Sequence, residues 1–111
     1  MIKLIEIMKR KEGLSLEAFN QHWQEVHGPL IKRTVPHIGR YVQNHAVRLP
    51  GGGEPPIDGV AEIWYDDFES WRASAKWVLG STGKEIQDDE DNFIDKSKTY
   101  GFICVEKVIK E

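Results

Sequence analysis

The sequence predicts an α+β fold in which helices cover one face of a four-stranded antiparallel sheet. Two observations support this: short apolar segments with period-two alternation are typical of strands, and two segments between them repeat apolar residues at helical spacing. Their order is β-α-β-β-α-β, the ferredoxin-like arrangement. Because 111 residues is a common size for one domain, we expect residues 1–111 to form a single domain.

The four expected strands cover residues 2–9, 37–49, 60–65 and 99–109. In the third, Glu62 and Trp64 share one face, since successive strand residues point to opposite sides. The Gly- and Pro-rich segment 50–59 is typical of a loop, and we expect a hairpin tip or a lid there.

The first helix is expected to begin after Ser15, a favourable N-cap. We expect it to end at Gly28-Pro29, since a glycine just beyond a helix followed by proline is a common stop signal. His22 and His27 are five residues apart, so an α-helix would direct them to different sides. The second helix is expected to start at Asp66 or Asp67, to break at residues 80–83 and to resume over 84–94.

Composition excludes several functional classes. The net charge is −3 and no Lys/Arg block occurs, so we expect no nucleic-acid partner. No apolar run approaches the roughly 18 residues that cross a bilayer, and the N-terminus lacks a signal-peptide pattern, so we expect no membrane association. Cys104 is the single cysteine, which fits a reducing, cytoplasmic location.

A sheet with helices on one side leaves its other face bare. The expected strands are apolar on both faces, with Ile5, Ile7, Ile63, Ile103 and Val105 among the residues involved. A large exposed apolar face is unusual for a monomer. We therefore expect a homodimer formed through the open sheet face.

The chemistry-bearing motifs point away from phosphate loops, nucleophile elbows and metal centres. Gly51-Gly52-Gly53 lacks the strand-to-helix context of a phosphate loop, and no closely spaced histidine pair occurs. We therefore expect neither metal nor cofactor. The remaining candidates for acid–base work are His27, His45, Glu62 and Asp89.

Each candidate has an alternative interpretation. His27 at a helix end is also a possible cap, where the helix dipole favours the imidazolium. His45 faces either solvent or a pocket, and Glu62 either acts as an acid or base or pairs with Arg40 or Arg48. In the acidic run 88–91, which is normally a solvated helix face, the nearby Phe93 suggests that Asp89 or Glu90 looks inward.

Four sequence blocks resemble the EthD family of dimeric α+β barrel proteins. They are His22-Trp23 with His27-Gly28-Pro29-Leu30, Tyr41-Val42-Gln43-Asn44-His45, Asp58-Gly59-Val60-Ala61-Glu62-Ile63-Trp64, and Asp89-Glu90 with Phe93-Ile94-Asp95. The resemblance implies a ferredoxin-like half-barrel that dimerises through its sheets, with a pocket between sheet and helices. The matching positions carried over as site residues are His27, Tyr41, Asn44, His45, Glu62, Trp64, Asp89 and Phe93.

These residues favour a cofactor-free lyase, isomerase, cyclase or dehydratase acting on a ring-shaped or polyketide-like small molecule. His27 or His45 would move the proton, and Glu62 or Asp89 would orient the imidazole. Substrate contacts would come from Tyr41, Asn44, Trp64 and Phe93. Two alternatives are an oxidoreductase or monooxygenase, including one with haem held by a histidine, and a non-catalytic binding protein of an oxidative catabolic pathway.

Overall fold

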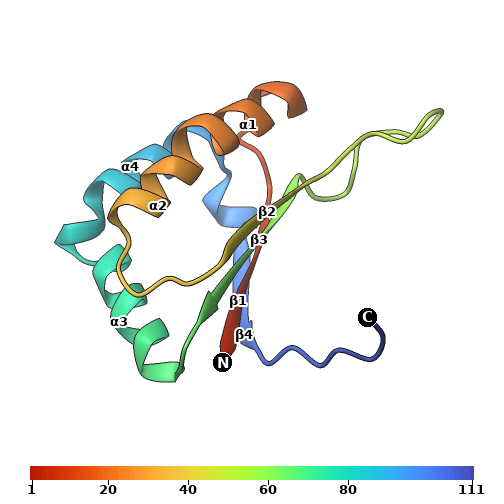
Figure 1. Cartoon of the computed structure of the whole chain (residues 1–111). Helices are drawn as coiled ribbons and strands as arrows, with labels where there is room; N and C mark the ends of the chain where they lie inside the picture. Colours follow the sequence, from red (N-terminus) through yellow and green to blue (C-terminus); the bar gives the residue numbers. More distant parts are fainter.

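The computed structural model describes all residues, Met1–Glu111, and has the predicted sheet. The strands are β1 (Ile2–Met8), β2 (Tyr41–His45), β3 (Gly59–Tyr65) and β4 (Tyr100–Cys104). They pair in the order β2-β3-β1-β4, and every neighbouring pair is antiparallel. The predicted ferredoxin-like fold class is therefore confirmed. Strands β2 and β4 are shorter than predicted, because residues 46–58 form an arm and residues after Cys104 form a tail (Figure 1).

All helices lie on one side of the sheet (Figure 1). They are α1 (Leu16–His22), α2 (Gly28–Thr34), α3 (Phe68–Leu79) and α4 (Lys84–Phe93). The predicted N-caps are present: Ser15 Oγ accepts from the Ala18 N–H, and the Asp67 carboxylate accepts from the Ser70 N–H. No helix is long and apolar enough to cross a membrane.

The prediction that Gly28-Pro29 ends the first helix is wrong. A π-helical segment, Trp23–His27, joins α1 to α2, so the helical path continues to Thr34. The Gly28 N–H bonds to the Trp23 carbonyl, five residues back. Pro29 is tolerated because it occupies the first turn of α2, where its missing N–H is least needed. His27 is therefore inside a continuous helical path and is not a C-terminal cap.

Sheet register fixes which strand residues can reach the helices. Glu6 lies opposite Ala61, and Leu4 opposite Ile63, on the face that the helices cover. Glu62 and Trp64 alternate with these residues and therefore lie on the open face. The predicted alternation of β3 is thus confirmed, and the sheet lies between Glu62 and the helices.

The main core lies where the π-helical segment meets the sheet. Trp23, Phe19 and Phe93 are fully buried there, and the rings of Phe19 and Phe93 are 5.5 Å apart. Gly59 provides the space for Trp23: a Cβ atom at this position would lie 2.4 Å from Trp23 Cζ3. Glycine at the start of β3 therefore lets the indole lie directly against the backbone.

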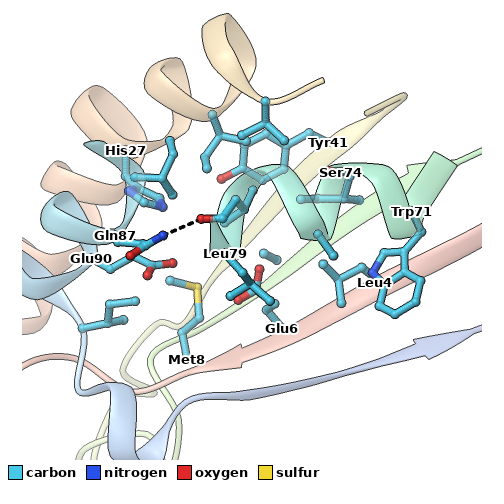
Figure 2. A pocket seen from close by; sticks show the side chains of 18 of the residues that line it. Leu4, Glu6, Met8, His27, Tyr41, Trp71, Ser74, Leu79, Gln87 and Glu90 are labelled. Atoms are coloured by element: carbon cyan, nitrogen blue, oxygen red, sulfur yellow. Dashed lines mark hydrogen bonds between the residues drawn. The ribbon is translucent and has the colours of Figure 1, made fainter. Parts of the chain in front are cut away.

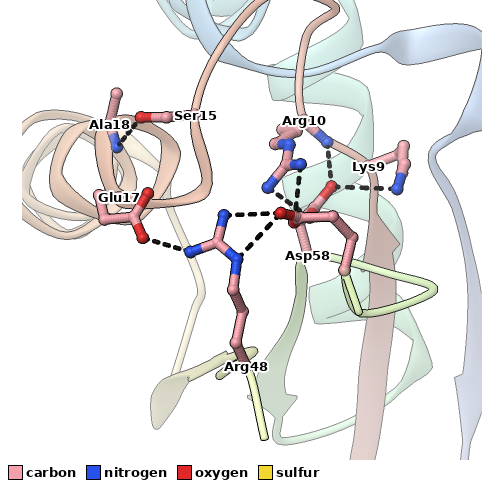
Figure 3. Close-up of polar contacts among 8 residues, drawn as sticks. Lys9, Arg10, Ser15, Glu17, Ala18, Arg48 and Asp58 are labelled. Carbon is pink, nitrogen blue, oxygen red and sulfur yellow. Dashed lines mark hydrogen bonds and ion pairs between the residues drawn. The ribbon is translucent and has the colours of Figure 1, made fainter. Parts of the chain in front are cut away.

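The arm of residues 46–58 projects away from the helical layer (Figure 1). None of its residues lines the cavity between the sheet and the helices. Its base is fixed by the fully buried Asp58 (Figure 3). The Asp58 carboxylate accepts from the Arg10 N–H at 2.7 Å and lies 3.6 Å from Lys9 Nζ. Arg48 links Glu17 of α1 to Glu54 of the arm, so Arg48 does not pair with Glu62. The arm is a hairpin extension and does not cover the cavity.

Candidate active site

A cavity of about 280 Å³ lies between the sheet and the helices (Figure 2). Most of its wall is apolar, but several polar side chains also line it. These are Glu6, His27, Tyr41, Tyr65, Ser74, Gln87 and Glu90. An apolar cavity with a few converging polar groups is the usual form of a small-molecule site.

Two histidines share one carboxylate beside this cavity. His27 Nδ1 is 2.8 Å from Asp89 Oδ2, and His22 Nε2 is 2.8 Å from Asp89 Oδ1. The π-helical segment explains the geometry, because its wider turn places residues five apart on the same side of the helical path. The expectation that His22 and His27 point to different sides is therefore wrong.

The contact with Asp89 determines which nitrogen of His27 is available. With Nδ1 donating to the carboxylate, Nε2 carries the lone pair and is the basic nitrogen. His27 lines the cavity, whereas His22 does not. Asp89 also accepts from Asn92 Nδ2 at 3.2 Å, which helps to hold the carboxylate in place.

Burial sets the protonation of this pair. It lowers the pKa of His27, and the hydrogen bond to Asp89 only partly opposes the effect. Burial acts to raise the pKa of Asp89, but hydrogen bonds from His27, Asn92 and His22 outweigh it and leave that pKa lowered. At neutral pH the pair is thus a neutral imidazole held by a carboxylate, which is the arrangement of a general base.

Two carboxyl groups that the sequence did not single out as catalytic line the cavity. Glu6 extends from β1 and Glu90 from α4 (Figure 2). Burial and the nearby Glu90 raise the pKa of Glu6 to about 7. Burial also raises the pKa of Glu90, although Lys96 Nζ lies 3.6 Å away. A carboxyl group that is protonated near neutral pH is a suitable general acid.

Two of the predicted site residues, Tyr41 and His45, lie on the same side of β2 but have different environments. Tyr41 lines the cavity, and its hydroxyl accepts from Gln43 Nε2 at 2.9 Å. His45 stacks on Trp23 at 4.6 Å between ring centroids and bonds to Gln43 Oε1. It does not line the cavity. Tyr41 can therefore contact a ligand in the cavity. His45 packs against Trp23 and does not reach the cavity.

Three predicted site residues lie on the open sheet face, away from the two histidines. Glu62 pairs with Lys3 at 2.8 Å and accepts from Asn44 Nδ2 at 2.9 Å. The Trp64 ring lies against the Lys3 ammonium and the Arg40 guanidinium, each 4.8 Å from its centroid. The hydrogen bond from Lys3 lowers the pKa of Glu62. Glu62 is thus an ion-paired carboxylate, with Lys3 as partner instead of Arg40 or Arg48.

Phe93 packs against the rings of His22 and His27 and does not line the cavity. It is fully buried, and its ring centroid is 4.8 Å from that of His27 and 4.9 Å from that of His22. Of the predicted residues, the structure therefore brings together His27, Asp89 and Phe93, with Tyr41 on the same cavity. No group of three or more His, Cys, Asp or Glu side chains is arranged to hold a metal ion.

One sequence signal would have identified Glu6. It alternates with Ile2, Leu4 and Met8 on a strand face that is otherwise apolar. A carboxylate on such a face is unexpected, because burial penalises its charged form. His22 had no comparable signal, since its position depends on the π-helical turn.

The family model of the EthD domain matches residues 11–97. The chain belongs to the EthD family. No curated protein matches the sequence. The EthD domain therefore contains the π-helical segment, both histidines and Asp89, while Glu6 lies outside the matched residues.

Solved structures agree with this assignment. An EthD family protein from Bacillus halodurans C-125 is 27% identical, with a TM-score of 0.71 over 96% of this chain and 99% of that chain. A dimeric ferredoxin-like protein of unknown function from Bacteroides fragilis NCTC 9343 has a TM-score of 0.63 at 8% identity, covering 93% of each chain. SnoaB, a cofactor-independent oxygenase from Streptomyces nogalater, has a TM-score of 0.62 at 9% identity, covering 99% and 97%. The last two likenesses concern the fold alone.

Proposed function

We propose that this EthD protein is a cofactor-free enzyme that moves a proton on a small ring-shaped or polyketide-like substrate, as a lyase, isomerase, cyclase or dehydratase does. The observation that carries the proposal is the His27–Asp89 pair at the wall of an apolar cavity. Asp89 holds the imidazole in the tautomer that leaves Nε2 basic. Burial keeps His27 neutral and able to accept a proton.

Glu6 supplies the complementary acid in this proposal. His27 Nε2 takes a proton from a carbon next to a substrate carbonyl, and the protonated Glu6 carboxyl donates to the oxygen on which charge develops. Tyr41 lines the same cavity and contributes ring contact. Glu62, Asn44 and Trp64 take no part in these steps, because they lie on the opposite sheet face.

The test is hydrogen–deuterium exchange of 2-tetralone in D₂O, followed by proton NMR. This two-ring ketone has acidic C–H bonds next to its carbonyl. We expect the protein to accelerate exchange and His27→Asn to abolish the acceleration, because asparagine cannot accept the proton. His37→Asn is the matched control, since His37 is exposed and has a positive φ of 69° that asparagine tolerates. Equal exchange by wild type and His27→Asn would refute the role of His27.

A cofactor-free oxygenase is the second candidate, supported by the shared fold with SnoaB. Such an enzyme also begins by removing a proton, so His27 would have the same role and oxygen would react with the resulting carbanion. An oxygen electrode separates the two, because only the oxygenase consumes O₂ with substrate. The haem-linked alternative fits poorly, since about 150 Å³ holds one benzene ring and 280 Å³ is too small for a macrocycle of four pyrrole rings. A carrier protein would bind 2-tetralone without accelerating exchange.

We also propose that the protein is a homodimer formed through the open sheet face. Tyr100 and Phe102 of β4 are exposed there, next to Ile5 and Ile7 of β1. Contiguous apolar surface of this kind usually marks an interface. Sedimentation velocity should show a dimer for wild type and a monomer for Phe102→Asp. Phe68→Asp, which changes an exposed phenylalanine on α3, should remain dimeric.

A further inference from the structure

The cavity lining contains carboxyl groups but no lysine or arginine. Its 20 lining residues include Glu6 and Glu90 as the acidic side chains. The one imidazole, that of His27, is kept neutral by burial. Lys96, the partner of Glu90, is not among the lining residues. At neutral pH and above, the charge inside the cavity is therefore either zero or negative.

Glu6 has hydrogen-bonding capacity that the protein does not use. It forms no hydrogen bond or ion pair with another side chain, and the surface that it exposes belongs to the cavity wall. The other ionisable groups around it are Glu90 of α4, His27 of the π-helical segment, Tyr41 of β2 and Tyr65 of β3. Both tyrosine hydroxyls are already engaged, with Gln43 and Ser74 respectively. Glu6 is half-buried on the cavity wall, so a ligand in the cavity can form a hydrogen bond with its carboxyl group.

We propose that the cavity selects uncharged ligands of one or two rings, whose carbonyl or hydroxyl oxygen forms a hydrogen bond with the Glu6 carboxyl group, and rejects carboxylates and phosphates of similar shape. An apolar cavity of about 150 Å³ holds benzene, so 280 Å³ has room for two fused rings. An anionic ligand would meet Glu6 and Glu90, and no lysine or arginine lines the cavity to bind its charge. The selectivity names the class of substrate for the proposed enzyme, and it rests on the proposed function only for the proton transfer by His27.

Selection by Glu6 has a defined pH dependence. Because the pKa of Glu6 is about 7, its carboxyl is a donor at pH 6 and an ionised acceptor at pH 8. The affinity for a neutral ketone should therefore fall about tenfold between pH 6 and pH 8. Glutamine donates at both pH values, so Glu6→Gln should bind the ketone with no such fall.

The experiment compares 2-tetralone, a neutral ketone, with 2-naphthoate, an anion of similar shape. Binding is measured through quenching of protein fluorescence, since Trp23 and Trp71 line the cavity. We expect wild type to bind 2-tetralone at least tenfold more tightly than 2-naphthoate at pH 8. We expect Glu6→Gln to bind 2-naphthoate more tightly than wild type does at this pH, because the variant removes one negative charge from the cavity wall. The matched control is Glu85→Gln, which removes an exposed charge from α4 and should behave as wild type.

Three results would overturn the inference. They are equal affinity of wild type for both probes at pH 8, an unchanged pH dependence in Glu6→Gln, and the failure of both probes to bind. The comparison of the two probes at pH 8 uses wild type alone, so it tests the proposal even if a variant folds poorly. His27→Asn separates this inference from the proposed function: it should keep the binding preference while losing proton exchange. A protein with the preference but no exchange in wild type is a selective binder, which refutes the enzyme and leaves the selectivity intact.

Discussion

Glu6→Gln should make the protein more stable, and more so at high pH than at low pH. The pKa of Glu6 is raised from an ordinary value of 4.5 to about 7 in the folded state. Because the pKa is higher in the folded state, the contribution of Glu6 to stability is fully present below its pKa in the unfolded state. This contribution is lost as the pH rises through its pKa in the folded state. The loss for this one group therefore develops between about pH 4.5 and pH 7.

The magnitude follows from the size of this shift. Each pKa unit corresponds to about 1.4 kcal/mol, so ionising Glu6 in the folded protein costs about 3 kcal/mol at pH 8 and below about 1 kcal/mol at pH 5. Glutamine has nearly the same shape and no charge. The stability gain of Glu6→Gln should thus increase by about 2 to 3 kcal/mol from pH 5 to pH 8.

Urea denaturation at fixed protein concentration, followed by tryptophan fluorescence, measures the gain at each pH. Subtracting wild type from variant removes the titration of shared groups that do not interact with Glu6, and the interaction of Glu6 with Glu90 remains part of the measured gain. Glu85→Gln controls for the loss of one surface charge. A gain for Glu6→Gln that stays constant between pH 5 and pH 8 would show that Glu6 is not held in an environment that opposes its charge.

Three further predictions concern other parts of the structure. Asp89→Asn should lower the pKa of His27 still further, because the carboxylate raises it, and a titration of the imidazole nitrogens by NMR would detect the change. Gly59→Ala should destabilise the protein by about 1 to 3 kcal/mol in urea denaturation, because the added methyl group collides with Trp23. Asp58→Ala should cost about 2 to 4 kcal/mol by the same assay, since it leaves Lys9 and Arg10 without their buried partner. Glu54→Ala, at the exposed end of the same network, should change stability little, and a large loss there would contradict this account of the arm.

The order of elements and the faces of β3 follow from sequence alone. Period-two alternation depends on local backbone geometry, so Val60–Tyr65 could be divided correctly between two faces of the sheet. The caps at Ser15 and Asp67 are local for the same reason. Local rules also predicted that one acidic side chain near Phe93 turns inward, and Asp89 does so, with 8% of its surface exposed.

The arrangement of the candidate site depended on tertiary contacts. The helical path continues past Gly28-Pro29 through a π-helical turn, and only that turn brings His22 and His27 to the same carboxylate. Which face of the sheet the helices cover decided that Glu6 lines the cavity and that Glu62 does not. Strand alternation divides residues into two faces, but it carries no information about which face receives the helices. That choice is made by packing between segments far apart in the sequence.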